Sequence, residues 1–434
     1  MLAYRLDTLL SIRVFYRKSR LYIAHVLNHF KPFLVLLVIS LIEGCAGTTP
    51  PPPTPEPAIS IVLSQPIRKP VEQSKTPEKI LVPAASSTPN EQQVKSLITK
   101  LLPATLKDKE GWASDLQSAY KALHISPTNE HFCAAIAVIE QESSFQADPM
   151  VPGLPGIIRR EIEQRQTKYS VPQSVIDWIL ATISHDGRSY QQRINALKTE
   201  KELSDLIEEM IDQIPAGRKL FTNYNPVHTG GPMQVSVDFA QSHVRARPYP
   251  YPIKTNLRSE VFTRRGGLYF GSAILLDYPA PYNDMLYRFA DFNAGRYSSR
   301  NAAFQLALSR LSKQTLAYDG DLLRYKNGIV SSEPSATLNA LLSLRKTLNM
   351  NETEILRDLQ LEKLSTFSNT PLYKTLFSLA DQSGVKPRVF MPEIDLKSPK
   401  ISRKLTTEWF ANRVNERYKN CLKQKKTDLK SSNH

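Results

Sequence analysis

The stretch from His131 to Phe145 reads His-Phe-Cys-Ala-Ala-Ile-Ala-Val-Ile-Glu-Gln-Glu-Ser-Ser-Phe, and every residue from 132 to 139 is apolar or small. A helix that is apolar on all sides is made for burial, not for contact with water. Ser126-Pro127 predicts its start, because Ser is a good N-cap and Pro is best tolerated at the first helical position. We therefore expect the central helix of a domain here.

Two carboxylates, Glu140 and Glu142, follow at the C-terminal end of this helix, before the chain breaks at Asp148-Pro149. At 100° per residue they point about 200° apart, so they do not form a close pair. Glu142 falls one turn beyond the apolar residues 138–139, where a carboxyl tends to stay protonated near neutral pH, as a general acid must. The alternative is a pair of solvated glutamates at a helix end.

Three segments follow one another in a meaningful order: Ala137–Pro149 with Glu-Ser at its centre, Gly231-Pro-Met-Gln234, and Phe292-Asn-Ala-Gly295. They resemble the A-x-I-x-x-E-S-x-F, G-L-M-Q and Y-N-A-G segments of the soluble lytic transglycosylases, the lysozyme-like enzymes that cleave murein. The resemblance covers about residues 125–310. It implies a mainly α, lysozyme-like fold with a small β element.

The resemblance also implies a chemistry. The family cleaves the β-1,4 bond between N-acetylmuramic acid and N-acetylglucosamine in the glycan strands of peptidoglycan, leaving a 1,6-anhydro sugar. One glutamate acts as acid and then as base, and no cofactor or metal takes part. Glu142 holds that position here. The matching substrate or cleft contacts would be Ser143, Gln234, Met233, Phe292 and Asn293, although Met233 is more often a packing residue.

One departure from the family concerns Phe292, which stands where the family has Tyr and therefore lacks a hydroxyl that Tyr287 or Tyr297 could replace. A second is the long segment between the first two motifs. Both leave open a non-catalytic envelope lipoprotein whose cleft binds glycan or a partner. A plain hydrolase, which leaves reducing ends, is a third possibility.

The N-terminal segment predicts export. Six basic residues precede a short apolar run, 33–42, that ends at Glu43-Gly-Cys45, and this order is typical of a signal peptide over residues 1–44. The run is too short to span a membrane. The ending resembles a bacterial lipobox, which implies lipidation of Cys45 and attachment to the periplasmic side of the outer membrane, since Ala46 is not a retention Asp. The alternative is a weak signal anchor with an incidental Cys.

The rest of the chain divides by composition. Residues 45–90 are rich in Pro and Ser and predict a disordered tether. Residues 91–310 form the lysozyme-like domain, with a helical insertion at about 150–229, and residues 311–434 a helical extension that could meet an envelope protein partner. The helices expected in the insertion span 156–169, 172–183, 191–198 and 201–214; those expected later span 302–311, 337–348, 352–361, 371–382 and 406–422.

Net charge and cysteine count bear on which partners and cross-links we expect for this protein. The formal net charge is +15, and removal of residues 1–44, with six basic and two acidic residues, leaves +11. The basic residues are scattered, so an anionic envelope polymer or a solvated surface suits them better than nucleic acid. Three cysteines give no disulfide framework, and Cys133 is most simply a small core residue. No metal-ligand spacing occurs.

Overall fold

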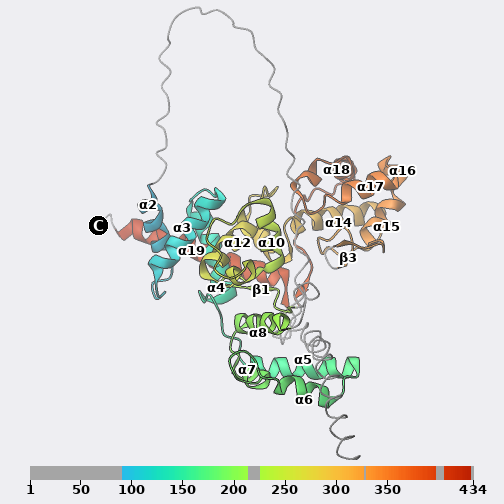
Figure 1. Ribbon diagram of the computed structural model, residues 1–434. Coiled ribbons are helices and arrows are strands. Elements are labelled where there is room, and N and C mark those ends of the chain that lie inside the picture. The colour runs from blue at the N-terminus through green and yellow to red at the C-terminus, as the bar shows by residue number, and fades with distance from the viewer. Residues whose placement is uncertain (1–89, 214–224, 327–328, 397–404, 432–434) are drawn as a thin grey trace, which may run out of the picture.

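The computed structural model describes residues 90–213, 225–326, 329–396 and 405–431, and Figure 1 shows how they are arranged. Within these ranges the chain is mainly helical, as predicted. Its strands are two residues long and pair as three antiparallel hairpins. The predicted signal peptide, the tether and Cys45 lie outside the described residues.

The central helix α4 spans Asn129–Ser143, and residues 132–139 are all buried, as the unbroken apolar run predicted. Its N-cap differs from the one expected. Thr128, not Ser126, accepts the hydrogen bond from the His131 amide (3.2 Å). Threonine is an adequate N-cap, and the helix therefore begins two residues later than Ser126-Pro127 suggested. Ser144 ends it in the left-handed conformation.

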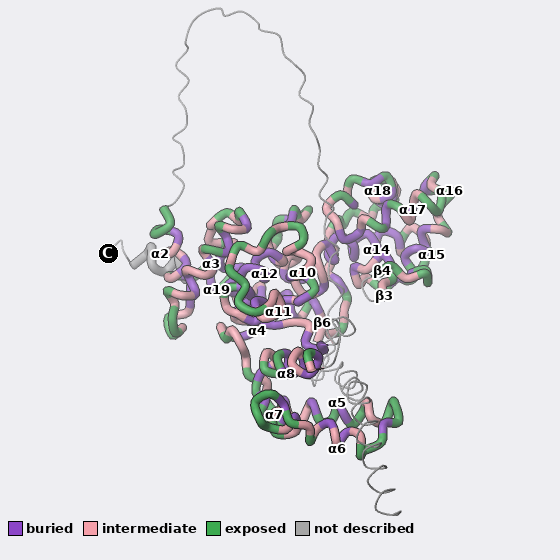
Figure 2. The backbone as a smooth tube through the Cα atoms, in the orientation of Figure 1, coloured by how far each residue is buried: buried purple, intermediate pink, exposed green. Residues whose placement is uncertain are grey.

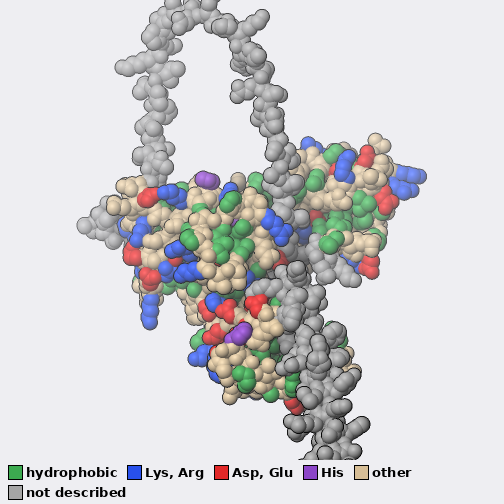
Figure 3. Space-filling view, in the orientation of Figure 1, with side chains coloured by type: hydrophobic (Ala, Val, Ile, Leu, Met, Phe, Trp, Pro, Cys, Tyr) green, Lys and Arg blue, Asp and Glu red, His purple; other side chains and the backbone are tan. Residues whose placement is uncertain are grey.

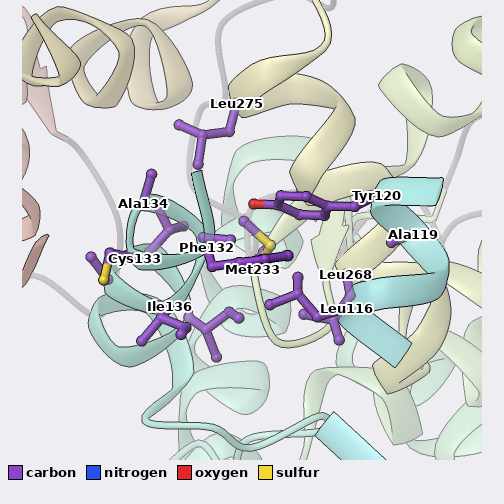
Figure 4. Close-up of a cluster of buried hydrophobic side chains, with 14 of the residues drawn as sticks. Leu116, Ala119, Tyr120, Phe132, Cys133, Ala134, Ile136, Met233, Leu268 and Leu275 are labelled. Carbon is purple, nitrogen blue, oxygen red and sulfur yellow. The ribbon is translucent and has the colours of Figure 1, made fainter. Parts of the chain in front are cut away.

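Other helices of the 91–310 region surround α4 (Figure 1). The shared core is the larger purple interior in Figure 2, and it takes residues from most of these helices. Figure 4 shows part of it, with Tyr120, Phe132 and Met233 packed together. The helices are α2 (Glu91–Leu101), α3 (Lys109–Leu123), α10 (Val237–Ala246), α11 (Leu257–Val261), α12 (Arg264–Leu276) and α13 (Met285–Ala294).

The insertion forms four helices, close to the four that apolar spacing predicted. They have a small core of their own, to which Val227 near the end of the insertion and Phe262 of the main domain also belong. An isolated bridge between Met150 and Thr199 brings the start of the insertion beside the start of its last helix. In Figure 1 the group lies apart from the central helices. The helices are α5 (Leu154–Tyr169), α6 (Gln173–Ala181), α7 (Tyr190–Ala196) and α8 (Glu200–Asp212).

The C-terminal region begins as a second helical body with its own apolar core, to which Phe304, Phe367 and Phe377 belong. The ring centre of Phe304 lies 5.3 Å from that of Phe367 and 6.2 Å from that of Phe377. The elements are α14 (Ser298–Ser312), β3 (Tyr325–Lys326), β4 (Ile329–Val330), α15 (Ala336–Ser343), α16 (Arg345–Leu348), α17 (Glu352–Leu359), the 3-10 helix η1 (Ser365–Asn369) and α18 (Pro371–Gln382).

The last helix returns to the first core. After the hairpin of β5 (Asp395–Leu396) and β6 (Leu405–Thr406), α19 (Thr407–Ser431) packs against α4 and α13. Its residues Phe410 and Val414 are buried in the main core. The end of the region expected as an extension is thus part of the domain that holds α4.

A disulfide joins this helix to α4. Cys133 and Cys421 are bonded, with Cα atoms 5.6 Å apart and 288 residues between them in the sequence. The expectation that three cysteines give no disulfide was therefore wrong, although Cys133 lies in the core as predicted. A bond across this separation leaves no local spacing pattern for a sequence to show.

None of the helices in the described part of the chain is long and apolar enough to cross a membrane. On the face shown in Figure 3, Lys and Arg side chains alternate with Asp and Glu.

Candidate active site

Glu142 is the second-to-last residue of α4 and is partly buried there. Burial raises the pKa of its carboxyl to about 7, from an ordinary value of 4.5. Desolvation disfavours the charged form, so near neutral pH a large fraction of this carboxyl carries a proton. Its position next to the apolar side of the helix predicted this behaviour. A carboxyl of this kind can donate a proton to a leaving oxygen and take one back.

Glu140, two residues earlier, lies in a different environment. Its side chain is 45% exposed, and one carboxylate oxygen lies 3.6 Å from Nε of Arg417 on α19. Glu140 therefore faces the C-terminal helix and an opposite charge. The two carboxylates thus lie in different environments, in line with the expectation that they do not form a close pair.

Ser143 connects the first motif to the second. Its hydroxyl is 2.8 Å from the carbonyl oxygen of Pro232 and 3.1 Å from that of Ile139, and it can donate to either. The side chain is buried. Its hydroxyl is thus used inside the protein, which assigns Ser143 to positioning the hairpin and not to direct contact with substrate.

The second motif is the turn of a hairpin between β1 (Thr229–Gly230) and β2 (Val235–Ser236). The resemblance implied a small β element in this domain. Gly231 has φ +73°, the left-handed conformation that favours glycine, and a Cβ there would lie 2.2 Å from the carbonyl oxygen of Val261. The hairpin also sits directly on α12, because a Cβ on Gly267 would lie 2.4 Å from Pro232.

Met233 points into the protein. It is fully buried, and a Cβ on Gly271 of α12 would lie 2.3 Å from its sulfur. Figure 4 shows the side chain among Phe132 and Leu268. Met233 was predicted as a substrate contact, with packing as the alternative; the structure gives it the packing role, since methionine readily fills an irregular space in a core.

Gln234 closes the turn with φ 49°, uncommon for a residue with a side chain. Its Nε2 donates to the carbonyl of Gly231 (3.2 Å), and its Oε1 lies 3.4 Å from the hydroxyl of Thr229. The amide therefore stabilises the turn, and the side chain remains partly exposed. Among the predicted cleft contacts it is the one on this hairpin that keeps access to solvent.

The third motif lies at the end of α13. Phe292 is partly buried and packs against the main core. The side-chain oxygen of Asn293 accepts a hydrogen bond from the hydroxyl of Thr407 (2.8 Å). Thr407 is the first residue of α19. Asn293 thus links the motif to the C-terminal helix. Tyr297, considered as a source of the missing hydroxyl, is buried with its ring 4.3 Å from the Arg300 guanidinium.

A buried carboxyl beside this motif was not among the predicted site residues. Asp291 accepts hydrogen bonds from the hydroxyls of Tyr278 (3.0 Å) and Tyr282 and from the amides of Tyr297 (2.9 Å) and Ser299 (2.8 Å). Burial raises the pKa of Asp291 to about 7, although these donors oppose the shift. Its partners hold the start of α14 against the end of α12, a structural role. The one sequence signal was its place immediately before Phe292.

No group of three or more His, Cys, Asp or Glu side chains in the described ranges is arranged to hold a metal ion.

The fold and site together define a helical domain in which a partly buried carboxyl lies at the end of a helix whose residues 132–139 are all buried, next to a serine that bonds to a hairpin. The chain belongs to the family described as protein of unknown function (DUF1615), which matches residues 105–424. It is 46% identical over 333 residues to the uncharacterized protein YaiW of Escherichia coli (strain K12), covering 76% of this chain and 90% of that relative. No solved structure matches it. The family match, residues 105–424, spans all three motifs and both bonded cysteines.

Proposed function

We propose that the chain is a peptidoglycan lytic transglycosylase that cleaves the β-1,4 bond between N-acetylmuramic acid and N-acetylglucosamine. The observation that carries the proposal is the Glu142 carboxyl, whose pKa burial raises to about 7 at the point where the Glu-Ser motif meets the hairpin. A general acid works best when its pKa lies near the working pH. The order of the three motifs supports the same assignment.

The proposed reaction uses Glu142 twice. Its proton goes to the glycosidic oxygen as the bond from that oxygen to C1 of the muramic sugar breaks. The resulting carboxylate then takes the proton of the C6 hydroxyl, whose oxygen bonds to C1 to close the 1,6-anhydro ring. Glu142 ends protonated and no water is consumed. The C6 hydroxyl belongs to the same sugar, so it has the advantage of an intramolecular nucleophile.

The alternative is an envelope lipoprotein that uses the same surface without catalysis. Two observations favour it: Phe292 brings no hydroxyl to the third motif, and the oxygen of Asn293 is bonded to Thr407. In that case the surface would bind glycan or a partner protein, and digestion of murein would give no product.

We also propose that the protein is anchored by lipidated Cys45 on the periplasmic side of the outer membrane. The Cys133–Cys421 bond supports export, because disulfides persist in oxidising compartments and are rare in the cytosol. Replacement of Cys45 by Ala should release the protein from membranes and abolish its labelling by fatty acid. Unchanged membrane attachment and labelling of that variant would contradict the anchor.

The test of the activity is digestion of purified murein by the protein and by matched variants. Glu142→Gln should abolish cleavage and leave folding intact, whereas Glu140→Gln should keep most activity. Mass spectrometry reads the mechanism, because hydrolysis adds one water per cut and the anhydro route adds none. Products heavier by water would indicate a hydrolase. Equal loss in both variants would contradict the single-acid assignment.

A further inference from the structure

A cavity of about 600 Å³ lies at the opposite end of α4 from Glu142. Its walls come from one side of α10, from the ends of α3 and α12 and the residues that follow them, from His131 near the start of α4, and from residues 296–297 and 363–364. Eleven residues of helix separate His131 from Glu142, which is about 16 Å along the axis. The cavity is therefore distinct from the candidate active site.

Arg247 is held in the wall by the end of another helix. Its guanidinium donates to Oδ2 of Asp277 (3.0 Å) and to the carbonyl of Leu123 at the end of α3 (3.4 Å). The last carbonyls of a helix lack partners within the helix and carry partial negative charge. The guanidinium therefore has a fixed position at the cavity.

Arg296 is fixed in a similar way by α12. It donates to the carbonyls of Ala273 (2.6 Å) and Ile274 (3.4 Å) near the end of that helix. Its guanidinium carbon also lies 5.1 Å from the ring centres of both Phe239 and Tyr278, which line the cavity. The guanidinium groups of Arg247 and Arg296 are thus both held in fixed positions in the wall of the same cavity.

The charge balance in the wall is positive. Arg247, Arg296 and Lys363 line the cavity, although the ammonium of Lys363 pairs with Asp321 outside the wall, and Asp277 is the one carboxylate among the lining residues. His243, also in the wall, does not offset this: burial first, then Arg296 and Arg247, lower the pKa of its ring to about 4. Burial is the main reason that this imidazole stays neutral, and the two arginines add to it because a positive neighbour disfavours a second positive charge.

The remaining wall is apolar and aromatic. Phe239, Leu276, Tyr278 and Leu364 belong to it. A volume of about 600 Å³ falls in the range of sites that enclose small organic molecules, which combine apolar walls with a few polar groups that fix orientation. Inorganic phosphate alone would leave most of this apolar surface uncovered.

We propose that the cavity binds a small organic carboxylate, with its anionic group at Arg247 and Arg296 and its aliphatic part on Phe239 and Leu276. Guanidinium groups match carboxylates in geometry and form charge-assisted hydrogen bonds with them. This site is independent of the glycan cleavage proposed for Glu142, so it stands or falls separately.

The test titrates the full chain with three probes: N-acetyl-leucine, its neutral amide N-acetyl-leucinamide, and inorganic phosphate, followed by NMR. The acid should bind, the amide should bind roughly tenfold more weakly or not at all, and phosphate should compete only weakly. Equal binding of acid and amide, or no binding of the acid, would overturn the proposal. Phosphate binding more tightly than the acid would overturn the carboxylate assignment.

Variants locate the binding. Arg247→Gln should weaken acid binding roughly tenfold or more, while Arg245→Gln, an exposed arginine of the same helix outside the cavity, should not change it. Ser242→Trp fills the cavity and leaves both arginines in place, so it should also abolish binding; thermal unfolding checks that each variant folds. Glu142→Gln should bind the acid normally. Equal weakening by Arg245→Gln and Arg247→Gln, or normal binding by folded Ser242→Trp, would place the acid elsewhere.

Discussion

The hydroxyl of Ser143 lies 2.8 Å from the carbonyl oxygen of Pro232, across 89 residues of sequence that include the whole described insertion. The residue that follows Glu142 thus holds the hairpin that returns from the insertion. Because the hydroxyl is buried, this contact does not compete with water. The position of the hairpin relative to the proposed acid depends on it.

Ser143→Ala should therefore reduce stability and activity together. The substitution leaves the buried Pro232 carbonyl without this donor, and an unsatisfied buried group costs about 1–3 kcal/mol. Urea unfolding should show the loss, and murein digestion should slow as the hairpin shifts. Ser144→Ala is the matched control, because the side chain of Ser144, next in the sequence, is exposed. An equal loss in both variants would contradict the role given to Ser143.

The raised pKa of Glu142 predicts a pH dependence of stability. Between pH 4.5 and 7 the folded chain keeps a proton on Glu142 that the unfolded chain has released, so folding binds protons. The stability from this group is full below pH 4.5 and is lost as pH rises through 7, by about 1–3 kcal/mol in total.

Glu142→Gln removes that decline. Relative to the unmodified protein, the variant should gain stability as pH rises from 4.5 and level off above 7. Urea unfolding at several pH values measures the difference, and Asp291, whose pKa is also raised to about 7, contributes equally to both proteins. A difference that stays constant with pH would show that Glu142 ionises as an ordinary surface carboxylate.

Gly271→Ala tests the contact between the hairpin and α12. The added Cβ would lie 2.3 Å from the sulfur of Met233, so Met233 must move within a filled core, at a cost of about 1–3 kcal/mol. Gly156→Ala on α5 is the control. Its Cβ would meet nothing nearer than 3.7 Å, and it should stabilise by about 0.4–1 kcal/mol. The same sign of change at both glycines would argue against the packing described for Met233.

Removal of the disulfide should loosen the C-terminal helix. The double variant Cys133→Ser, Cys421→Ser opens a loop of 288 residues in the unfolded chain, which gains conformational entropy. Loss of a native disulfide typically lowers the free energy of unfolding by about 2–5 kcal/mol. Hydrogen exchange should then become faster in α19 and in the face of α4 that it covers. Slower or unchanged exchange there, with α18 unaffected, would mean that packing alone holds α19.

Local patterns predicted local structure well. The apolar run predicted the buried helix α4, and apolar spacing predicted a helix over 201–214, which is observed as α8 (Glu200–Asp212). The small β element that the resemblance implied is the hairpin of β1 and β2, whose turn contains Gly231 in the left-handed conformation. Each of these features depends on residues within one or two turns of the chain.

What the sequence could not predict depends on distant partners. The place of α19 against α4 follows from packing between residues almost three hundred positions apart. Asp291 acquires its environment from Tyr278 and Tyr282 only after folding. Whether Ser143 and Met233 face a ligand or the interior was likewise decided by the hairpin that lies over them.

The return of α19 has a consequence for how the protein is made. Chains emerge from the ribosome, and from an export channel, N-terminal end first. The apolar face of α4 that α19 covers then stays uncovered until Thr407 and the residues after it have been delivered. Two intervening helical bodies can form in that interval, each around its own core. A product truncated ahead of α19 would display this apolar face and a lone Cys133 thiol, both of which invite chaperones and aggregation during biogenesis.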